Sequence, residues 1–575
     1  MVNSRNWKQI IAVVTACIIG MTGCQNSTIN LEEQASLENA DSASSKETEE
    51  VDSWKKENYQ KIVFEGDSIS TSADGVFVDG TTVTITSGGT YVLSGVLQNG
   101  RIVVDATKED KVTLVWNGVE ISCADAAPVY IIQADKTIFY LADQTENFIT
   151  DGERYLFLDG ETEPDAAVFA KDDLTIKGTG SLTVNANYYD GIVCKNDLKI
   201  TGGKLTVYAV HHGIKGKDSL TVKGGTIFVD AGEDGMKSSN EALVEEDGKK
   251  VGWVQIEDGT ITIAAKDDAI HAESDLTING GIITITESYE GLEGACIYLN
   301  GGEISLYASD DGVNASGYSI TNTVNEKENF FENIPPDRIE MGEEEGERKE
   351  KLEKKGEAYG TRKAMGTMSS GGYLEINGGT IYVNADGDGI DVNGSIVMNG
   401  GIVQVDGTES GGDGTLDYDT TFEINGGVLI GVGNQAMAQT ATSGSAQNSM
   451  AVYFDTMQKA GSIVSVLDSS GKELLSYTSK KQYNFFLFSS EKLELEHTYM
   501  VLVDEVEQQS LVLSEVVTTS GNVSKMQGFG GRNHGRVPEG EEIPKELPDS
   551  EMERPDKWNE PSEIEKPEEE KEENY

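Results

Sequence analysis

The amino-acid sequence predicts an all-β protein built mainly from a right-handed parallel β-helix of ~22-residue coils. A Gly-Gly pair recurs with a spacing near 22 residues. On both sides of each pair, apolar residues alternate with polar ones over short runs, which is typical of strands with one buried face. No helical pattern separates these runs. Because one coil alone cannot close a core, we expect the coils to stack.

The Gly-Gly pair gives the period of the repeat. Its first glycine lies at positions 202, 224, 280, 301, 378, 400 and 426, with separations of 22, 56, 21, 77, 22 and 26 residues. The longest two separations contain further coil sequence and inserted residues, and Asp258-Gly259 replaces one pair. We expect each pair to mark a bend where a positive φ is useful. The blades of a β-propeller need about 40 residues, so that rival fold fits poorly.

A polar residue followed by Gly or Ala begins the third run of each coil, and we call these residues the corner column. Its members are Asp190, His212, Asp234, Asp268, Glu290, Asp311 and Asp388. Equivalent residues of stacked coils lie about 4.8 Å apart, so the corner side chains would form one line if the insertions preserve the register.

The chain begins with a predicted export signal over residues 1–23, which has a short basic start and then an apolar run at Ile10–Ile19. The sequence MTGC at its end is similar to a bacterial lipobox. It predicts lipidation of Cys24 and anchoring on the extracellular face of the bacterial cell membrane. An ordinary signal peptide with a chance cysteine is the alternative. Residues 24–60 are polar and predict a flexible tether.

Composition sets the remaining boundaries. We expect the β-helix over residues 61–439, with a charged, largely disordered excursion at about 320–370. A small β cap is predicted over 440–518, and an acidic disordered tail over 519–575.

Charge and cysteine content exclude two classes of function. The formal net charge of −54 argues against nucleic-acid binding and favours cations as partners. Beyond Cys24 an odd number of scattered cysteines remains, which favours buried free thiols over a disulfide framework or a zinc site. They are Cys123, Cys194 and Cys296.

The repeat resembles a known family. The NGG segments at Asn279, Asn300, Asn377 and Asn399 and the Asp-Gly corners at 190, 234, 311 and 388 carry the resemblance. The family is that of exported bacterial carbohydrate-binding domain-containing proteins, parallel β-helix proteins related in shape to pectate lyases. The resemblance implies binding of polysaccharide, including pectic or polygalacturonate chains or cellulose. It also implies calcium at stacked aspartates and no established catalytic activity.

Repulsion within a column of carboxylates also favours a cation. Ca²⁺ binds six to eight oxygens, which neighbouring acidic coils could supply. The candidate calcium ligands are Asp234, Asp267, Asp268, Glu290, Glu293, Asp310, Asp311, Asp386, Asp388, Asp391 and Asp413. The alternative for any one Asp-Gly is turn chemistry, in which Asp hydrogen-bonds its own backbone.

Candidate carbohydrate-binding residues lie beside the same corners: Tyr188, Tyr189, Tyr289, Lys215 and Lys237. The tyrosines could stack on sugar rings or be ordinary strand surface. The lysines could form a cationic groove for uronates or be ordinary loop residues.

Three functions remain open from the sequence. A non-catalytic, calcium-assisted polysaccharide binder is favoured. A polysaccharide lyase would need a base, for which Lys195, Lys215 and Lys237 are candidates, and a hydrolase would need paired carboxylates. The third is a surface scaffold or adhesin without sugar specificity.

Overall fold

The computed structural model describes residues 52–157, 160–244, 248–320 and 368–521. The predicted signal peptide, Cys24, nearly all of the charged excursion and nearly all of the acidic tail lie outside the described residues. The described chain is all-β apart from one 3-10 turn, η2 (Ser53–Lys56), and 38 of its strands join one mostly parallel sheet. The predicted all-β class is therefore confirmed. No helix in these ranges is long and apolar enough to cross a membrane.

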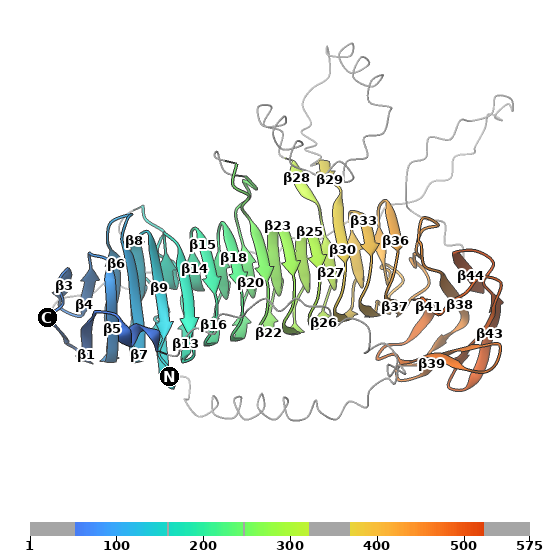
Figure 1. Cartoon of the computed structure of the whole chain (residues 1–575), viewed down its shortest axis with the longest axis horizontal. Coiled ribbons are helices and arrows are strands. Elements are labelled where there is room, and N and C mark those ends of the chain that lie inside the picture. The colour runs from blue at the N-terminus through green and yellow to red at the C-terminus, as the bar shows by residue number, and fades with distance from the viewer. Residues whose placement is uncertain (1–51, 158–159, 245–247, 321–367, 522–575) are drawn as a thin grey trace, which may run out of the picture. The chain divides into compact units, whose positions relative to one another are not determined.

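The strands of the main sheet fall into three families, and within each family strands pair in parallel as the chain advances (Figure 1). The first family follows the Gly-Gly positions. It comprises β1 (Tyr59–Gly66), β5 (Gly89–Leu97), β7 (Lys111–Cys123), β10 (Glu146–Asp151), β13 (Ser181–Ala186), β16 (Lys204–Ala209), β19 (Thr226–Ala231), β22 (Thr260–Ala265), β24 (Ile282–Glu287), β26 (Glu303–Ala308), β31 (Thr380–Ala385), β34 (Ile402–Asp406) and β37 (Val428–Gly433).

The second family carries the corners. It comprises β4 (Thr82–Ile85), β6 (Arg101–Asp105), β8 (Val129–Gln133), β11 (Ala166–Ala170), β14 (Asp190–Cys194), β17 (Ile214–Gly216), β20 (Met236–Ser238), β23 (Ile270–Ile278), β25 (Leu292–Leu299), β27 (Val313–Ala315), β32 (Ile390–Val392) and β35 (Asp417–Tyr418). The third family precedes the Gly-Gly positions. It comprises β9 (Lys136–Leu141), β12 (Leu174–Gly178), β15 (Asp197–Ile200), β18 (Ser219–Val222), β21 (Trp253–Ile256), β30 (Gly372–Ile376), β33 (Gly394–Met398) and β36 (Thr421–Ile424), with the ends of β23 and β25.

The alternating apolar residues form continuous buried columns. Ile261 pairs with Ile283, which pairs with Ile304 in the next coil, and that residue pairs with Ile381 across the segment 321–367. All four side chains are buried, and one apolar cluster extends from Ile62 to Leu487. The register therefore survives the longest insertion.

The asparagines of the NGG segments are joined by a ladder of side-chain hydrogen bonds. The Asn300 side chain donates to Asn279 Oδ1 at 2.8 Å, and Asn377 donates to Asn300 at the same distance. Asn399 and Asn425 continue the ladder at 2.9 and 3.0 Å. The second glycine of each pair has a positive φ, as Gly281 with φ 94° illustrates, so the predicted bend is confirmed.

The ends differ in construction from the coils. At the N-terminal end, β2 (Ile69–Thr71) pairs with β1 and β3 (Val76–Asp79) pairs with β4, both antiparallel. Trp54 packs against Val92 and Val115, so ordered structure begins before residue 60, where the tether was expected to end. A short pair, β28 (Tyr318–Ile320) and β29 (Met368–Ser370), flanks the undescribed segment.

The C-terminal strands form a second packed layer. They are β38 (Ser449–Gln458), β39 (Ile463–Asp468), β40 (Glu473–Thr478), β41 (Tyr483–Ser490), β42 (Thr498–Val503), β43 (Val506–Val512) and β44 (Val517–Gly521). The strand β41 pairs antiparallel with β37 and β38, so it covers the last coil. Residues of β37, β38 and β41 pack against the four-stranded sheet β40-β39-β42-β43 in a separate apolar cluster. The cysteines at 123, 194 and 296 are buried free thiols, as expected.

Candidate cation and carbohydrate site on the corner face

The corner column is continuous through seven coils. The N–H that follows each corner residue donates to the carbonyl of the next corner: Gly191 to His212, Gly213 to Asp234, Gly235 to Asp268, Ala269 to Glu290, Gly291 to Asp311 and Gly312 to Asp388, at 2.9–3.0 Å. The predicted register is therefore confirmed.

Corner carboxylates cap the backbone of the following coil. Asp268 N donates to Asp234 Oδ1 at 3.2 Å, and Asp388 N donates to Asp311 Oδ1 at 2.7 Å. Gly414 N donates to Asp388 in the same way. The turn-chemistry alternative is thus partly right, but the acceptor serves the next coil rather than its own backbone. A corner acid has a structural role even without a metal.

From His212 onward, the residues three positions after the corners form a second line, which Asp417 continues in the coil after Asp388, and we call this line the flanking column. Parallel pairing places its members side by side: Lys215, Lys237, His271, Glu293, Asn314, Asp391 and Asp417. The line is cationic in its N-terminal coils and acidic in its C-terminal coils. This change decides how each corner acid is neutralised.

In the N-terminal coils, lysine side chains balance the negative charge of the corner aspartates. Lys215 Nζ donates to Asp190 at 2.7 Å, and Lys237 Nζ donates to Asp234 at 2.7 Å. Burial opposes the charge of Asp190, but bonds from His211 and Lys215 hold its pKa below the usual value. Burial lowers the pKa of His212 to about 4, so its neutral Nδ1 accepts from Asp234 N at 3.2 Å.

His271 neutralises the central coils. Its Nδ1 contacts Asp268 Oδ2 at 3.0 Å and also Glu293, and its Nε2 lies 3.6 Å from Glu273. Burial alone would lower the histidine pKa, but these three carboxylates raise it to about 12. His271 is therefore a fixed cation. Next to it, burial and the charges of Glu293 and Asp268 raise the pKa of Glu290 to about 8.

The C-terminal coils bring three carboxylates together without such a cation. Oxygens of Asp311, Asp388 and Asp391 lie within 4.8 Å of one another. We call these three residues the carboxylate cluster. Burial and neighbouring acids raise their pKa values to about 6, 7 and 6 respectively. Among the ion pairs of the described residues, none involves any of the three.

An unpartnered oxygen belongs to the same part of the face. Asn314 pairs in register with Asp391 and lies three residues after Asp311. Its Nδ2 donates to Glu290 at 2.8 Å, whereas its buried Oδ1 has no hydrogen-bond partner within the described ranges. Leaving a buried acceptor unpaired is costly, and a cation would satisfy it.

Other predicted ligands are divided among different roles. Asp386 does not join the carboxylate cluster, because it accepts from Lys481 Nζ at 2.8 Å and from the Tyr307 hydroxyl at 2.9 Å. Asp413 accepts from Ser410 Oγ at 2.9 Å. Asp267 and Asp310 lie one residue before their corners, and both are partly exposed. The remaining predicted ligands lie beside basic side chains of the protein, namely Lys237 and His271. They are Asp234, Asp268, Glu290 and Glu293.

The predicted sugar contacts are only partly available. Lys215 and Lys237 point into the corner column as partners of aspartates, which does not fit a free cationic groove. Tyr188 stacks on Tyr155 with ring centroids 4.2 Å apart. Tyr189 stacks on His211 with ring centroids 3.8 Å apart, and Tyr189 and Tyr289 are 37% and 47% exposed.

Sequence reasoning missed the flanking column as a unit. His271, Glu273, Asn314 and Asp417 were not among the predicted site residues. The signal was present in the fourth residue of the corner segments from His212 onward, which read HGIK, DGMK, DAIH, EGLE, DGVN and DGID. Reading that position down the repeat gives the change from basic to acidic side chains.

A mostly parallel sheet of repeated coils places the chain among the repeat proteins of the all-β class. A family model described as carbohydrate-binding domain-containing protein matches residues 79–325. A carbohydrate-binding domain-containing protein of Acetivibrio thermocellus is 49% identical over 228 residues, which cover 39% of this chain and 78% of the relative. The chain belongs to this carbohydrate-binding domain-containing family.

A solved structure is also similar in part. It is described as that of the polysaccharide lyase-like protein from C. thermocellum, in a gadolinium derivative. The sequence identity is 44%, the TM-score is 0.38, and the match covers 40% of this chain and 91% of the other. The family match includes most of the corner column, whereas Asp388 and Asp391 lie beyond residue 325.

Proposed function

We propose that this protein is a lipid-anchored lipoprotein of the bacterial cell surface that binds polysaccharide with the help of calcium and without catalysis. The carboxylate cluster is the observation that carries this proposal. Its three acids share one face with exposed tyrosine edges, and the described neighbours supply no counter-charge. Pectic or polygalacturonate chains and cellulose are the expected polymers.

The residues present fit calcium. Asp311, Asp388 and Asp391 offer hard oxygen ligands, and the buried Asn314 Oδ1 offers a neutral one, which is the donor set that Ca²⁺ prefers. Bound calcium would neutralise the cluster and attract the carboxylates of an acidic polymer. The His271 groups fit less well, because a protonated imidazole already balances Asp268 and Glu293.

A lyase or hydrolase is the second function proposed from the sequence, and the site favours it less. Each lysine considered as a base is engaged: Lys195 with Glu163, Lys215 with Asp190 and Lys237 with Asp234. Burial would lower the pKa of Lys237, but its bond to Asp234 raises it. A base must be able to lose its proton near neutral pH, so this setting favours binding.

The repeated coils suit a polymer ligand. We infer that the three strand families wind as a right-handed parallel β-helix, capped by the strands from β38 onward. Such a body repeats its surface about every 4.8 Å, so one chain of sugars could contact several coils. A scaffold or adhesin without sugar specificity would use the same shape but would not require the carboxylate cluster.

The test is retention of the full-length chain on insoluble cellulose and on polygalacturonate, with calcium or with EGTA. We expect calcium-dependent retention and no release of unsaturated or reducing ends. The double variant Asp388→Asn with Asp391→Asn should lose the calcium dependence, whereas Asp105→Asn, at the exposed last residue of β6, should retain it. Sugar release would favour the enzyme, and absence of retention on every polymer would favour the scaffold.

A further inference from the structure

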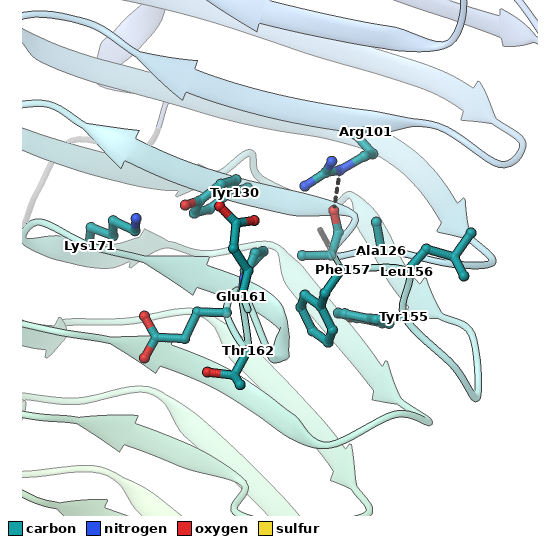
Figure 2. A pocket seen from close by; sticks show the side chains of 12 residues that line it. Arg101, Ala126, Tyr130, Tyr155, Leu156, Phe157, Glu161, Thr162 and Lys171 are labelled. Atoms are coloured by element: carbon teal, nitrogen blue, oxygen red, sulfur yellow. Dashed lines mark hydrogen bonds between the residues drawn. The ribbon is translucent and has the colours of Figure 1, made fainter. Parts of the chain in front are cut away.

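A pocket of about 520 Å³ lies on the N-terminal coils, away from the carboxylate cluster. Arg101 begins β6, Tyr130 lies in β8 and Lys171 follows β11, so parallel pairing of these strands brings the three side chains together. Tyr155 and Phe157, from the connection after β10, line the same pocket (Figure 2). Its volume is that of a small-ligand site.

Arg101 provides a planar donor at this pocket. Its Nε donates to the Ala127 carbonyl at 3.0 Å, and its guanidinium carbon lies 5.9 Å from the Tyr130 ring centroid. This side chain is half-buried, and within the described ranges no carboxylate forms an ion pair with it. The two terminal nitrogens remain able to donate to a ligand.

Lys171 adds a second positive charge. Its Nζ lies 5.6 Å from the centroid of the same Tyr130 ring. A hydrogen bond with Tyr130 raises the pKa of this lysine, which therefore stays charged. Glu163 at the edge of the pocket pairs with Lys195, whereas Glu161 is exposed on the rim. The two cations thus face one unpaired rim carboxylate.

The walls are aromatic. The Tyr155 and Phe157 ring centroids are 6.0 Å apart, and Tyr155 is held by its stacking on Tyr188 and by its hydroxyl bond to Asp151 at 2.7 Å. In Figure 2 the rings of Tyr155 and Phe157 lie below Arg101, whereas Tyr130 and Lys171 lie to their left, and the Glu161 side chain lies between Tyr130 and the rings. Sugars present apolar C–H faces to aromatic rings, and their carboxylates suit the two-pronged donor of arginine.

We propose that this pocket binds one carboxylated sugar unit, whose carboxylate pairs with the terminal nitrogens of Arg101. The ring of the sugar would pack against Phe157, and Lys171 would add electrostatic attraction. This inference rests on the proposed polysaccharide binding and specifies a uronate as the sugar class. It also predicts a contact that does not depend on calcium, because the pocket supplies its own cations.

Calorimetric titration of the full-length chain with trigalacturonate and with cellotriose, both in EGTA, tests this pocket. We expect trigalacturonate to bind and cellotriose to bind at least tenfold more weakly. Arg101→Gln should weaken trigalacturonate binding by tenfold or more, and Arg101→Lys should be intermediate because it keeps the charge but loses the fork. Glu161→Gln should strengthen binding a few-fold by removing repulsion. Arg154→Gln, an exposed arginine outside the pocket lining, is the matched control and should change nothing.

Arg101→Gln should weaken trigalacturonate binding and Glu161→Gln should strengthen it. A folding defect would only weaken binding, so the two results together exclude that explanation. Melting curves of each variant add a second check. Unchanged trigalacturonate affinity in Arg101→Gln would overturn the pocket proposal. If the same variant were still retained on polymer, the proposed polysaccharide binding would remain supported. Equal binding of both trisaccharides would overturn the uronate assignment. Absence of trigalacturonate binding in EGTA would do the same, whatever calcium-dependent retention occurs.

Discussion

Replacing Asp388 with asparagine should stabilise the calcium-free protein at pH 8. The Asp388 pKa is raised by burial and by the nearby Asp311 and Asp417 from 3.8 to about 7. A shift of that size corresponds to about 4 kcal/mol. Because the side chain is partly exposed, solvent screening reduces the usable value to about 1–2 kcal/mol. The asparagine oxygen can still accept from Gly414 N, so the backbone cap is retained.

The sign follows from the folded-state pKa. A carboxyl group whose pKa is raised on folding costs nothing below its unfolded value near pH 4, becomes progressively destabilising as pH rises towards 7, and stays so above. In EGTA, Asp388→Asn should therefore raise the melting temperature at pH 8 by about 1–3 °C and leave it nearly unchanged at pH 4.

Calcium should reverse the ranking. At millimolar calcium the wild-type protein should gain melting temperature through ligand linkage, and the variant should gain less because one ligand oxygen has lost its charge. Scanning calorimetry at the two pH values, with and without calcium, gives all four comparisons. Equal destabilisation by the substitution under all conditions would refute the electrostatic reasoning and leave Asp388 as a backbone cap only.

Three further substitutions test other parts of the fold. His271→Gln should cost about 3 kcal/mol in denaturant unfolding at pH 7.5, because Asp268 and Glu293 lose their buried cation. The His271 pKa is raised from 6.5 to about 12, so the stability that its charge contributes is complete below about pH 6.5 and should persist in part to pH 9. If the substitution lowered stability only at acidic pH, His271 would not be a fixed cation. Asn377→Ala removes two ladder bonds and should cost about 1 kcal/mol, whereas Asn425→Ala at the ladder end should cost about half as much. Gly281→Ala should lower stability by about 2 kcal/mol or more, because φ is 94° and a Cβ would lie 2.9 Å from the Gly259 carbonyl oxygen. Gly248 has φ 86° but no atom near its Cβ position, so Gly248→Ala measures the cost of the backbone conformation alone.

The sequence predicted the strands and the corner register because both depend on local alternation. A Leu or Ile at every second position and a Gly-Gly bend specify the same coil in each repeat, and the pairing of Ile304 with Ile381 shows that inserted residues do not alter it. Side-chain partners were harder to predict. Lys237 could serve a ligand or Asp234, and only the packed rotamer decides in favour of the aspartate.

The pocket could not have been predicted from the repeat. Arg101, Tyr130 and Lys171 come from three degenerate N-terminal coils, and Phe157 comes from an irregular connection. No periodic signal relates such residues. Such a pocket forms where the repeat is irregular, because the connection after β10 departs from the coil and its side chains enclose a space beside the strands.

The two columns explain why an acidic corner can be repeated without one fixed partner. The corner aspartates accept a backbone N–H of the next coil, which favours an acceptor at that position whatever lies beside it. The flanking residue is free of that backbone constraint, so it can vary from lysine to histidine to aspartate along the stack. Lys237 balances the corner acid of its own coil, Asp234, and Lys215 balances Asp190 of the preceding coil. Where it is Asp391, the corner acids Asp311 and Asp388 gain an acidic neighbour instead of a cation. The same backbone arrangement therefore supports ion pairs in the N-terminal coils and a candidate cation site in the C-terminal coils.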